Sequence, residues 1–432
     1  MRIRLGGAAG WKHTQTLSGD KSLSHRSLIF AGLASTPSVI GGLSTGADVE
    51  STASVLRQLG CRIEKDTGGA VQVQGWGAAG PKEPPNVLDC GNSGTTMRLL
   101  AGLLSGYPGL FILDGDDSLR KRPQARIIRP LTRMGGSLWA RRNDTLCPLV
   151  VKGGALTPFR GRPEVASAQV KSSILLAALA AGVEVELEEL ALTRDHTENM
   201  LRGLGVPLHS EGLKVHLPAG PHSFDGYRFE VPGDPSSAAF LVAAAVLGTG
   251  TRVSVEGVCL NPTRTGFFNI LERMGARITL TETERRMGEP VGTITAESSR
   301  LIGTTVEPEE VPSAIDEFPL LAVVATAAEG HTVVRGAEEL RVKECDRIRC
   351  VVTELSKMGA RITEAPDGFT VYGPTPLNGA PVECHDDHRL EMSLAVAALT
   401  AKGSTNLLHA GWASISFPEF WTFYPGERLT FD

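Results

Sequence analysis

The sequence is poor in aromatic residues, which make up only 5% of its 432 residues, and it has no extended run of lysine or arginine. Proteins that bind single-stranded nucleic acid usually combine basic grooves with stacking aromatic side chains. The formal net charge is −5, so the chain as a whole does not attract a polyanion. The composition therefore argues against a nucleic-acid partner.

Cysteine is also sparse: the seven residues are scattered, no CxxC pair occurs, and no cysteine–histidine spacing resembles a zinc site. This pattern is typical of reduced thiols in a cytoplasm. The apolar runs are roughly a dozen residues long, too short to cross a bilayer. The first residues, MRIRLGGAAGWKH, lack the apolar stretch of a signal peptide. We therefore expect a cytoplasmic protein with no membrane partner.

Glycine, in contrast, is abundant at 49 residues, and a hydrophobic content of 41% is ordinary for a globular protein. A chain of this length exceeds one ordinary core, so two domains are expected.

A helix-like segment recurs six times at intervals of roughly 70 to 80 residues, and we call these segments the repeat helices. Each copy has a polar first turn and then a run rich in Ala, Leu and Val, and five of the six end at or near glycine. Apolar residues surround most of each run, which indicates a buried helix. The Ser, Asp or Asn at the start is a suitable N-cap and the closing glycine a suitable C-cap. The polar first turns begin near residues 21, 92, 167, 234, 315 and 387.

A second element follows each repeat helix after roughly 40 residues: an amphipathic helix that ends in Leu-Gly or Met-Gly and leads into a short strand. Five copies are clear, namely VLRQLGCRI, LTRMGGSLW, MLRGLGVPL, ILERMGARITL and LSKMGARITE, and a sixth, FWTFYPGERLTF, is degenerate. Alternating segments such as AVQVQGW, GLKVHLP and GFTVYGP are predicted strands. Together these patterns predict an α/β protein of six copies of one unit, in two domains of three that divide near residues 231–237. The alternative is two unrelated α/β domains with coincidental spacing.

Basic residues occupy the polar first turn, or lie close to it, in four of the six repeat helices, although the helix dipole makes a cation there unfavourable by about 0.3–1 kcal/mol. Anions, in contrast, are favoured at a helix N-terminus. We therefore interpret these first turns as sites for an anionic ligand. The basic residues are Lys21, His25, Arg26, Arg98, Lys171, His388 and Arg389.

Three further segments carry weaker signals. LDCGNSGTTMRLL (88–100) is predicted to be a strand, a glycine turn and a helix start, whose amides could approach phosphate or carboxylate. In DSLRKRPQARIIRP, proline restricts the backbone beside Arg122. In ELRVKECDRIRC, Lys343 and Arg347 would share a face and repel each other if the segment is helical. Taken alone, each has a plain alternative: an ordinary turn or a solvated charged face.

Nine motifs occur in the order found in 5-enolpyruvylshikimate-3-phosphate synthases: GDKSLSHR, GNSGTTMR, the arginine of RKRP, SAQVKS, RDHTE, AIDEFP, LRVKECDR, DHR and SFP. They cover nearly the whole chain, which thus resembles that family. The resemblance implies two inside-out α/β domains of three repeated units each, the enolpyruvyl transferase fold. It implies a first domain of residues 20–232, on the shikimate-phosphate side, and a second of residues 233–432 that is completed by the N-terminal strand segment 1–19.

The resemblance also implies a reaction. The enolpyruvyl group of phosphoenolpyruvate moves to the 5-hydroxyl of shikimate 3-phosphate and phosphate is released, a step of chorismate and aromatic amino-acid biosynthesis. Neither half of this addition and elimination needs a metal or a redox cofactor, and the family pattern suggests a monomer. Two anionic substrates require several cations, and guanidinium groups suit phosphate and carboxylate.

Site residues carry over from the matching motifs. Asp316 resembles the base that takes the 5-hydroxyl proton, and Glu344 the acid that protonates the methylene carbon, with Lys21 as a helper. The implied shikimate 3-phosphate contacts are Lys21, Ser22, Arg26, Ser167, Ala168, Gln169, Arg194, Asp316 and Lys343. The implied phosphoenolpyruvate contacts are Lys21, Gly94, Arg122, Gln169, Arg347, His388 and Arg389.

The chain departs from common family patterns at three positions: Ile415 stands where some members have lysine, Leu99 where many have proline, and Thr193 where serine is common. One alternative is the sister transferase that acts on UDP-N-acetylglucosamine, which shares the fold and the phosphoenolpyruvate chemistry. Its Ala-Lys-Asn start and its loop cysteine have no match here, since the start is DKSLSHR and the segment 114–130 contains no cysteine. A non-catalytic protein that binds a phosphorylated ligand on the same scaffold is the second alternative.

Overall fold

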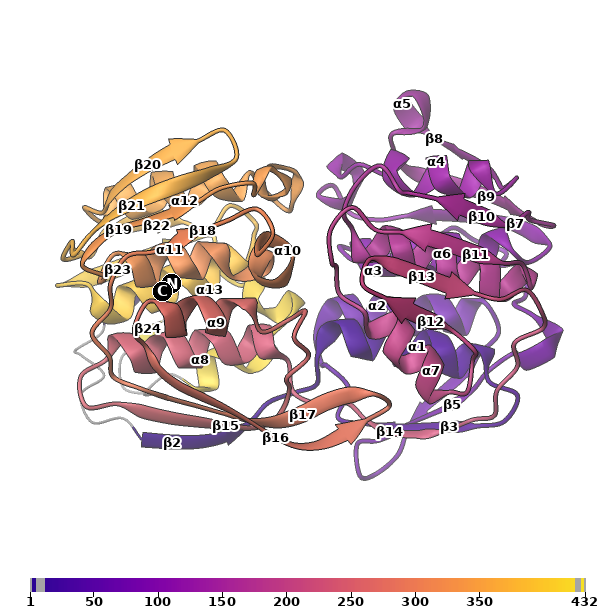
Figure 1. The fold of residues 1–432 in the computed structure, drawn as a ribbon, viewed down its shortest axis with the longest axis horizontal. Coiled ribbons are helices and arrows are strands. Elements are labelled where there is room, and N and C mark those ends of the chain that lie inside the picture. Colours follow the sequence, from indigo (N-terminus) through magenta and orange to yellow (C-terminus); the bar gives the residue numbers. More distant parts are fainter. Residues whose placement is uncertain (1, 5–11, 424–428, 431–432) are drawn as a thin grey trace. The chain divides into compact units, whose positions relative to one another are not determined.

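The computed structural model describes residues 2–4, 12–423 and 429–430 (Figure 1). The chain forms two compact units. Unit 1 takes the described residues of Met1–Ser18, Pro232–Glu284 and Pro290–Asp432, and unit 2 takes Gly19–Val231 and Arg285–Glu289. The chain therefore enters unit 2 after Ser18 and leaves it after Val231, and the tip of one later hairpin also belongs to unit 2.

Unit 2 contains three four-stranded sheets around three buried helices (Figure 1). The buried helices are α1 (Lys21–Leu33), α3 (Gly94–Ser105) and α6 (Ala168–Ala181). The other helical segments are α2 (Ala47–Gln58), α4 (Ala125–Arg133), α5 (Arg141–Asp144) and α7 (His196–Gly203). The sheets, in strand order, are β14 (Arg228–Glu230), β3 (Ser38–Gly41), β5 (Val71–Gln74) and β4 (Arg62–Lys65); β6 (Leu88–Asp89), β7 (Gly109–Asp114), β9 (Leu146–Gly153) and β8 (Ser137–Ala140); and β10 (Phe159–Gly161), β11 (Val185–Glu188), β13 (Lys214–Leu217) and β12 (His209–Glu211).

The described part of unit 1 has the same organisation, with α8 (Pro235–Leu247), α11 (Phe318–Ala325) and α13 (His388–Thr400) buried at its centre. The other helices are α9 (Gly266–Arg273), α10 (Val311–Ala314) and α12 (Arg347–Lys357). The sheets, in strand order, are β16 (Arg277–Arg286), β17 (Glu289–Glu297), β15 (Arg252–Cys259) and β2 (Lys12–Thr16); β18 (Thr305–Val306), β19 (Gly330–Val334), β21 (Gly368–Gly373) and β20 (Arg361–Ala365); and β22 (Pro381–Glu383), β23 (Ser404–Leu408), β1 (Arg2–Arg4) and β24 (Leu429–Thr430).

Strand pairing repeats from sheet to sheet among the described residues. In unit 2 the parallel pairs are β14 with β3, β6 with β7, and β10 with β11. In unit 1 they are β2 with β15, β18 with β19, and β22 with β23. In each sheet the inner strand of the parallel pair also has an antiparallel neighbour. This repetition confirms the prediction of six copies of one α/β unit.

Four of the six repeat helices, α1, α3, α8 and α13, begin where a polar side chain accepts an N–H of the first turn, whereas α6 and α11 have no such side-chain cap. Asp20 accepts the N–H of Leu23 at 2.8 Å before α1, and Asp387 accepts the N–H groups of Arg389 and Leu390 before α13. At the other end of α6, Gly182 has a φ of 67° and so forms a left-handed C-cap. The second-element helices and the strands after them also form as predicted, at α2, α4, α7, α9 and α12.

One local expectation is wrong: the segment around Lys343 is not a continuous helix. A 3₁₀ turn ends at Val342, Lys343 is extended, and Asp346 caps a new helix, α12, by accepting the N–H of Arg349 at 3.1 Å. Lys343 and Arg347 therefore do not share a helix face. Of the degenerate sixth element, Pro418–Phe423 forms a 3₁₀ helix, while residues 424–428 and 431–432 lie outside the described residues.

In the part of the chain that the structure describes, every helix is too short or too polar to cross a bilayer.

Candidate active site

The first turns of the buried helices in unit 2 carry most of the predicted substrate-binding residues of that unit. The N–H groups of a first helical turn have no acceptor within the helix, so these positions favour anions. We call this set the unit 2 cluster; it consists of Lys21, Ser22, Arg26, Gly94, Arg122, Ser167, Ala168, Gln169 and Arg194.

Arg26 is 3% exposed, and its guanidinium makes three hydrogen bonds. It donates to Thr197 Oγ1 at 2.8 Å, to Ser172 Oγ at 2.9 Å and to the carbonyl of Ser22 at 3.0 Å. All three acceptors are neutral. Burial lowers the pKa of Arg26 to about 10, which keeps the group charged at neutral pH. A buried cation whose hydrogen bonds go to neutral groups is suited to an anionic ligand.

Lys21, in contrast, already has a carboxylate partner. Its Nζ lies 3.1 Å from Oδ2 of Asp48, a largely buried residue in the first turn of α2. The side chain of Lys21 is 19% exposed, so this cation remains accessible while its position is fixed.

Gln169 is hydrogen-bonded to Arg98, and Gly94 lies close to the guanidinium groups of Arg98 and Arg122. Arg98 donates to Gln169 Oε1 at 2.6 Å, and Gln169 Nε2 donates to Thr95 Oγ1 at 3.0 Å, which joins α3 to α6. A Cβ on Gly94 would lie 3.3 Å from an Nη of Arg98 and 3.6 Å from an Nη of Arg122. The missing side chain therefore keeps two guanidinium groups close to the α3 N-terminus.

Arg122 is 8% exposed and is oriented by the loop before α3. One Nη donates to Asn92 Oδ1 at 2.7 Å and to Ser118 Oγ at 3.1 Å, and the other donates to the carbonyl of Asn92 at 3.3 Å. The neighbouring Arg120 differs, because it is exposed and pairs with Asp114 at 2.7 Å. The arginine-rich segment thus separates into one ordered guanidinium and a solvated face.

Lys171 does not join this cluster, although it is one of the cations near the start of a repeat helix. It is 1% exposed and lies 2.8 Å from Glu189 and 2.6 Å from Glu198. Burial alone would lower the pKa of Lys171, but the two carboxylates outweigh it, so the pKa is raised. Lys171 is a buried structural cation, and the expectation of a ligand contact there is wrong.

His25 is the second basic residue of these helices for which that expectation is wrong. It is fully buried, and its Nδ1 lies 2.6 Å from Thr52 Oγ1. Burial, Lys21 and Arg26 all lower its pKa, so the imidazole is neutral and does not attract an anion.

Unit 1 groups the predicted catalytic carboxylates around one arginine. Arg347 is 2% exposed; its Nε lies 2.7 Å from Asp387 Oδ2, one Nη lies 2.8 Å from Glu344 Oε2, and the other lies 3.6 Å from Asp316 Oδ1. Burial alone would lower the pKa of Arg347, but these carboxylates raise it overall. Lys343 Nζ lies 3.8 Å from the same Asp316 oxygen. We call Asp316, Lys343, Glu344, Arg347, His388 and Arg389 the unit 1 cluster.

His388 and Arg389 form the first turn of α13 and are both buried. Arg389 Nη lies 3.8 Å from Glu317 Oε1, and Glu317 also accepts a hydrogen bond from Ser236. The adjacent carboxylates of the 3₁₀ turn Ile315–Glu317 thus face different arginines, Arg347 and Arg389.

Sequence reasoning missed the residues that partner these cations, because each is an ordinary polar or acidic residue in the sequence. Most of them, though not Asp48, nevertheless lie within the matched motifs, so the motifs were a usable hint. Those within the motifs are Asn92 in GNSGTTMR, Ser172 in SAQVKS, Thr197 and Glu198 in RDHTE, Glu317 in AIDEFP and Asp387 in DHR.

The structure places the three residues that depart from common family patterns. Thr193 keeps a hydroxyl function, because its Oγ1 donates to Glu189, the partner of Lys171. Leu99 is fully buried in α3, and Ile415 is 7% exposed at the end of the 3₁₀ turn Trp412–Ile415.

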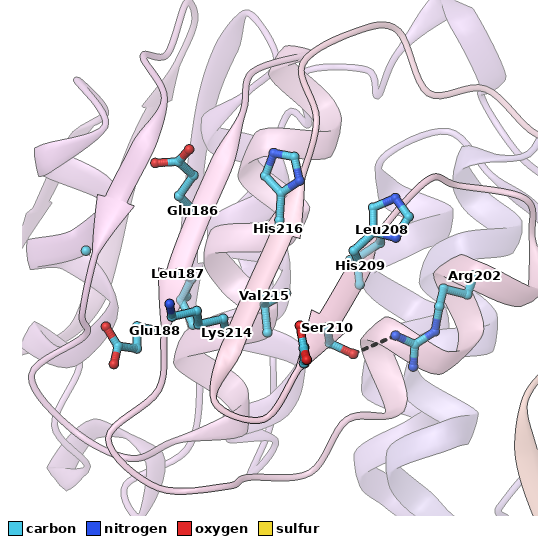
Figure 2. Close-up of a pocket in the computed structure, with 12 residues that line it drawn as sticks. Glu186, Leu187, Glu188, Arg202, Leu208, His209, Ser210, Lys214, Val215 and His216 are labelled. Atoms are coloured by element: carbon cyan, nitrogen blue, oxygen red, sulfur yellow. Dashed lines mark hydrogen bonds between the residues drawn. The ribbon is translucent and has the colours of Figure 1, made fainter.

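A groove of about 930 Å³ lies elsewhere in unit 2, on the outer face of the sheet β10–β11–β13–β12 (Figure 2). Its walls carry groups of both signs, including Glu186, Glu188, Lys214 and Arg202, which donates to Ser210 Oγ at 2.7 Å. None of the residues of the unit 2 cluster lines this groove. This groove is therefore separate from the helix N-termini that carry the unit 2 cluster.

Comparison with known proteins identifies the family. The model of the EPSP synthase (3-phosphoshikimate 1-carboxyvinyltransferase) family matches residues 12–423. A 3-phosphoshikimate 1-carboxyvinyltransferase of Synechococcus sp. (strain JA-3-3Ab) is 46% identical over 420 residues, which are 97% of this chain and 95% of the relative. One of Syntrophomonas wolfei is 47% identical over 407 residues, or 94% of this chain and 95% of the relative.

Solved structures agree with this result. An EPSP synthase from Acinetobacter baumannii has a TM-score of 0.86 at 40% identity and covers 98% of this chain and 96% of that one. The enolpyruvyl transferase NikO from Streptomyces tendae, with a TM-score of 0.75 at 18% identity over 97% of this chain and 95% of that one, shares the fold. The activity is that of an EPSP synthase, a transferase of the shikimate pathway and of aromatic amino-acid biosynthesis. From the motifs, the repeated sheets and these matches, the chain belongs to the EPSP synthase (3-phosphoshikimate 1-carboxyvinyltransferase) family.

Proposed function

We propose that the chain transfers the enolpyruvyl group of phosphoenolpyruvate to the 5-hydroxyl of shikimate 3-phosphate, using the side chains of the two clusters. The observation that carries this proposal is the arrangement around Arg347, which lies 2.8 Å from Glu344 and 3.6 Å from Asp316. One buried cation thus orders two carboxylates, and an addition followed by an elimination needs both a base and an acid.

Asp316 is the proposed base. As the 5-hydroxyl oxygen bonds to C2 of phosphoenolpyruvate, Asp316 takes the hydroxyl proton. Its neighbours Lys343 and Arg347 lie 3.8 and 3.6 Å away and hold the carboxyl group in place.

Glu344 is the proposed acid. It gives a proton to the methylene carbon of phosphoenolpyruvate, which becomes a methyl group, and takes one back from that methyl group as the C2–O bond to phosphate breaks. The departing phosphate takes up the proton that Asp316 had accepted, so both carboxyl groups return to their starting forms and the products are the enolpyruvyl ether and phosphate. The side chain of Glu344 is 11% exposed, which limits competing exchange with water. Lys21 is the proposed helper for these transfers.

The remaining residues bind the substrates in this proposal. Ser22, Arg26, Ser167, Ala168, Gln169 and Arg194 contact shikimate 3-phosphate, together with Lys21, Asp316 and Lys343. Gly94, Arg122, Gln169, Arg347, His388 and Arg389 contact phosphoenolpyruvate, together with Lys21. The neutral hydrogen-bond acceptors of Arg26 and the ordered guanidinium of Arg122 support these roles. Bidentate guanidinium contacts suit phosphate and carboxylate groups.

Arg122→Met is expected to raise the KM for phosphoenolpyruvate by at least ~10-fold, because it removes a charge-assisted contact of about 1.5–3 kcal/mol. The KM for shikimate 3-phosphate should change much less. Steady-state phosphate release at varied concentrations of each substrate measures both. Arg120→Met is the matched control, since Arg120 lies two residues away but is exposed and paired with Asp114. A rise in both KM values, or an equal effect of Arg120→Met, would contradict the role given to Arg122.

We also propose that the protein acts in the cytoplasm. All seven cysteines are free thiols, which suits a reducing compartment. The proposed monomeric state follows from the family resemblance.

A further inference from the structure

Four buried side chains form a hydrogen-bonded chain that links three helices of unit 2. His25 Nδ1 lies 2.6 Å from Thr52 Oγ1, Thr52 Oγ1 lies 2.6 Å from Thr96 Oγ1, and Thr96 Oγ1 lies 2.7 Å from Ser93 Oγ. All four residues are 0% exposed. Such a chain in a buried setting has directional bonds that fix the relative position of the elements it joins.

This hydrogen-bonded chain of side chains begins and ends one helical turn or less from residues of the unit 2 cluster. His25 follows Lys21 by one turn on α1, and Thr96 lies two residues after Gly94 on α3. Ser93 is the N-cap of α3 and accepts the N–H of Thr96 at 3.1 Å. Thr52 lies on α2, one turn after Asp48, the partner of Lys21. The chain therefore ties the start of α3 to the start of α1 through one face of α2.

The two central hydroxyl groups are the vulnerable points. Each has one hydroxyl or imidazole neighbour on either side, and Thr96 Oγ1 also donates to the carbonyl of Asp48 at 3.5 Å. Among the described residues, His25 Nε2 has no hydrogen-bond partner that could compensate. Removing either hydroxyl leaves buried polar groups unsatisfied at a cost of about 1–3 kcal/mol. The helices can recover part of this cost only by shifting relative to each other.

We propose that the chain His25–Thr52–Thr96–Ser93 is a positioning device that holds Gly94 in register with Lys21 and thereby sets the affinity for phosphoenolpyruvate. This inference rests on the proposed function, in which both residues contact that substrate. Arg98 and Arg122 lie 3.3 and 3.6 Å from the position of the missing Cβ of Gly94, so a shift of α3 changes how closely both guanidinium groups approach this residue. A misplacement of 1 Å can reduce a rate by about 10²-fold.

Arg26 provides a contrast within the same helix. It is held by Thr197 and Ser172, which belong to α7 and α6 and do not take part in the chain. Loss of the chain should therefore affect phosphoenolpyruvate more than shikimate 3-phosphate.

The test uses variants of Thr96 and Thr52 with the KM of each substrate as the readout. Thr96→Val keeps the shape and removes the hydroxyl, and it should raise the KM for phosphoenolpyruvate about tenfold, with less than a twofold change for shikimate 3-phosphate. Thr96→Ser restores the hydroxyl and should return both values to within about twofold of the wild type. Ser105→Ala is the matched control on α3: this hydroxyl is buried too, but it donates to the carbonyl of Ala101 in its own helix.

Thr52→Val distinguishes loss of the hydrogen-bonded chain from a local effect at α3, because Thr52 lies on α2 and is not a residue of the unit 2 cluster. It should raise the KM for phosphoenolpyruvate as Thr96→Val does, and the double variant should be no worse than either single one, since both break the same chain. An unchanged KM in Thr52→Val, an equal rise for both substrates, or a failure of Thr96→Ser to rescue would overturn the proposal.

A spectroscopic readout keeps this test apart from the test of function. The imidazole ¹⁵N signals of His25 should report a neutral ring at neutral pH in the wild type and should shift in Thr52→Val. Signals that do not respond to Thr52→Val would overturn the hydrogen-bonded chain itself. Absence of phosphate release by the wild-type protein would instead refute the proposed function.

Discussion

Glu344→Gln and Asp316→Asn are each expected to lower turnover by at least ~10²-fold, the usual scale for a general acid or base. Both substitutions keep the shape of the side chain and an oxygen that can face Arg347, but they remove the group that exchanges a proton. Initial rates of phosphate release at saturating substrates measure the effect. Glu338→Gln is the matched control, because Glu338 is exposed in the 3₁₀ turn that ends just before Lys343.

The affinity for shikimate 3-phosphate should further distinguish the role of Glu344 from that of Asp316. Glu344→Gln should leave the affinity for shikimate 3-phosphate, measured by calorimetry, nearly unchanged, because its proposed partner is the methylene carbon of the other substrate. Asp316→Asn should weaken that affinity, since Asp316 is a proposed contact of the 5-hydroxyl. Near-normal turnover in either variant would show that its proton-transfer role is wrong.

Arg347→Met is expected to lower the free energy of unfolding by about 3–5 kcal/mol, the scale for breaking a buried ion pair from one side. Asp387 is fully buried, and its strongest partner is Arg347 Nε at 2.7 Å. The variant would leave that carboxylate with its hydrogen bonds from Cys345 and from the first turn of α13. Urea unfolding followed by circular dichroism provides the measurement.

Arg349→Met provides the comparison for that experiment, because Arg349 lies on the same first turn of α12 but is exposed. It should change the free energy of unfolding by no more than about 0.5 kcal/mol. Similar losses in the two variants would mean that the charge cluster around Asp387 contributes no more than a solvated arginine does.

The repeat helices were predictable because their signals are local. Asp20, Ser93 and Asp387 sit directly before apolar runs, and each side chain accepts an N–H of the turn that it precedes. The signal for the break at Lys343 is also local, because Asp346 caps α12. The charged residues around it fit a continuous helix equally well, so the sequence alone did not reveal the break.

The sequence did not predict which groups surround each cation at the start of a repeat helix, because those groups are side chains that are distant in the sequence. Lys171 and Arg26 look alike in their helices, yet Lys171 pairs with two glutamates while Arg26 donates to two hydroxyl groups and one backbone carbonyl. The strand pairing has the same origin: Ile3 of β1 lies opposite Thr405 of β23, and no short-range pattern encodes that register. Only the family resemblance indicated which segments far apart in the sequence lie together.

The most direct test of the central claim is phosphate release from phosphoenolpyruvate by the wild-type protein, measured with and without shikimate 3-phosphate and EDTA. We predict release that requires both substrates and is unchanged by the chelator, because the proposed proton transfers use only side chains of this chain. Release with UDP-N-acetylglucosamine in place of shikimate 3-phosphate, or loss of activity on chelation, would contradict the account.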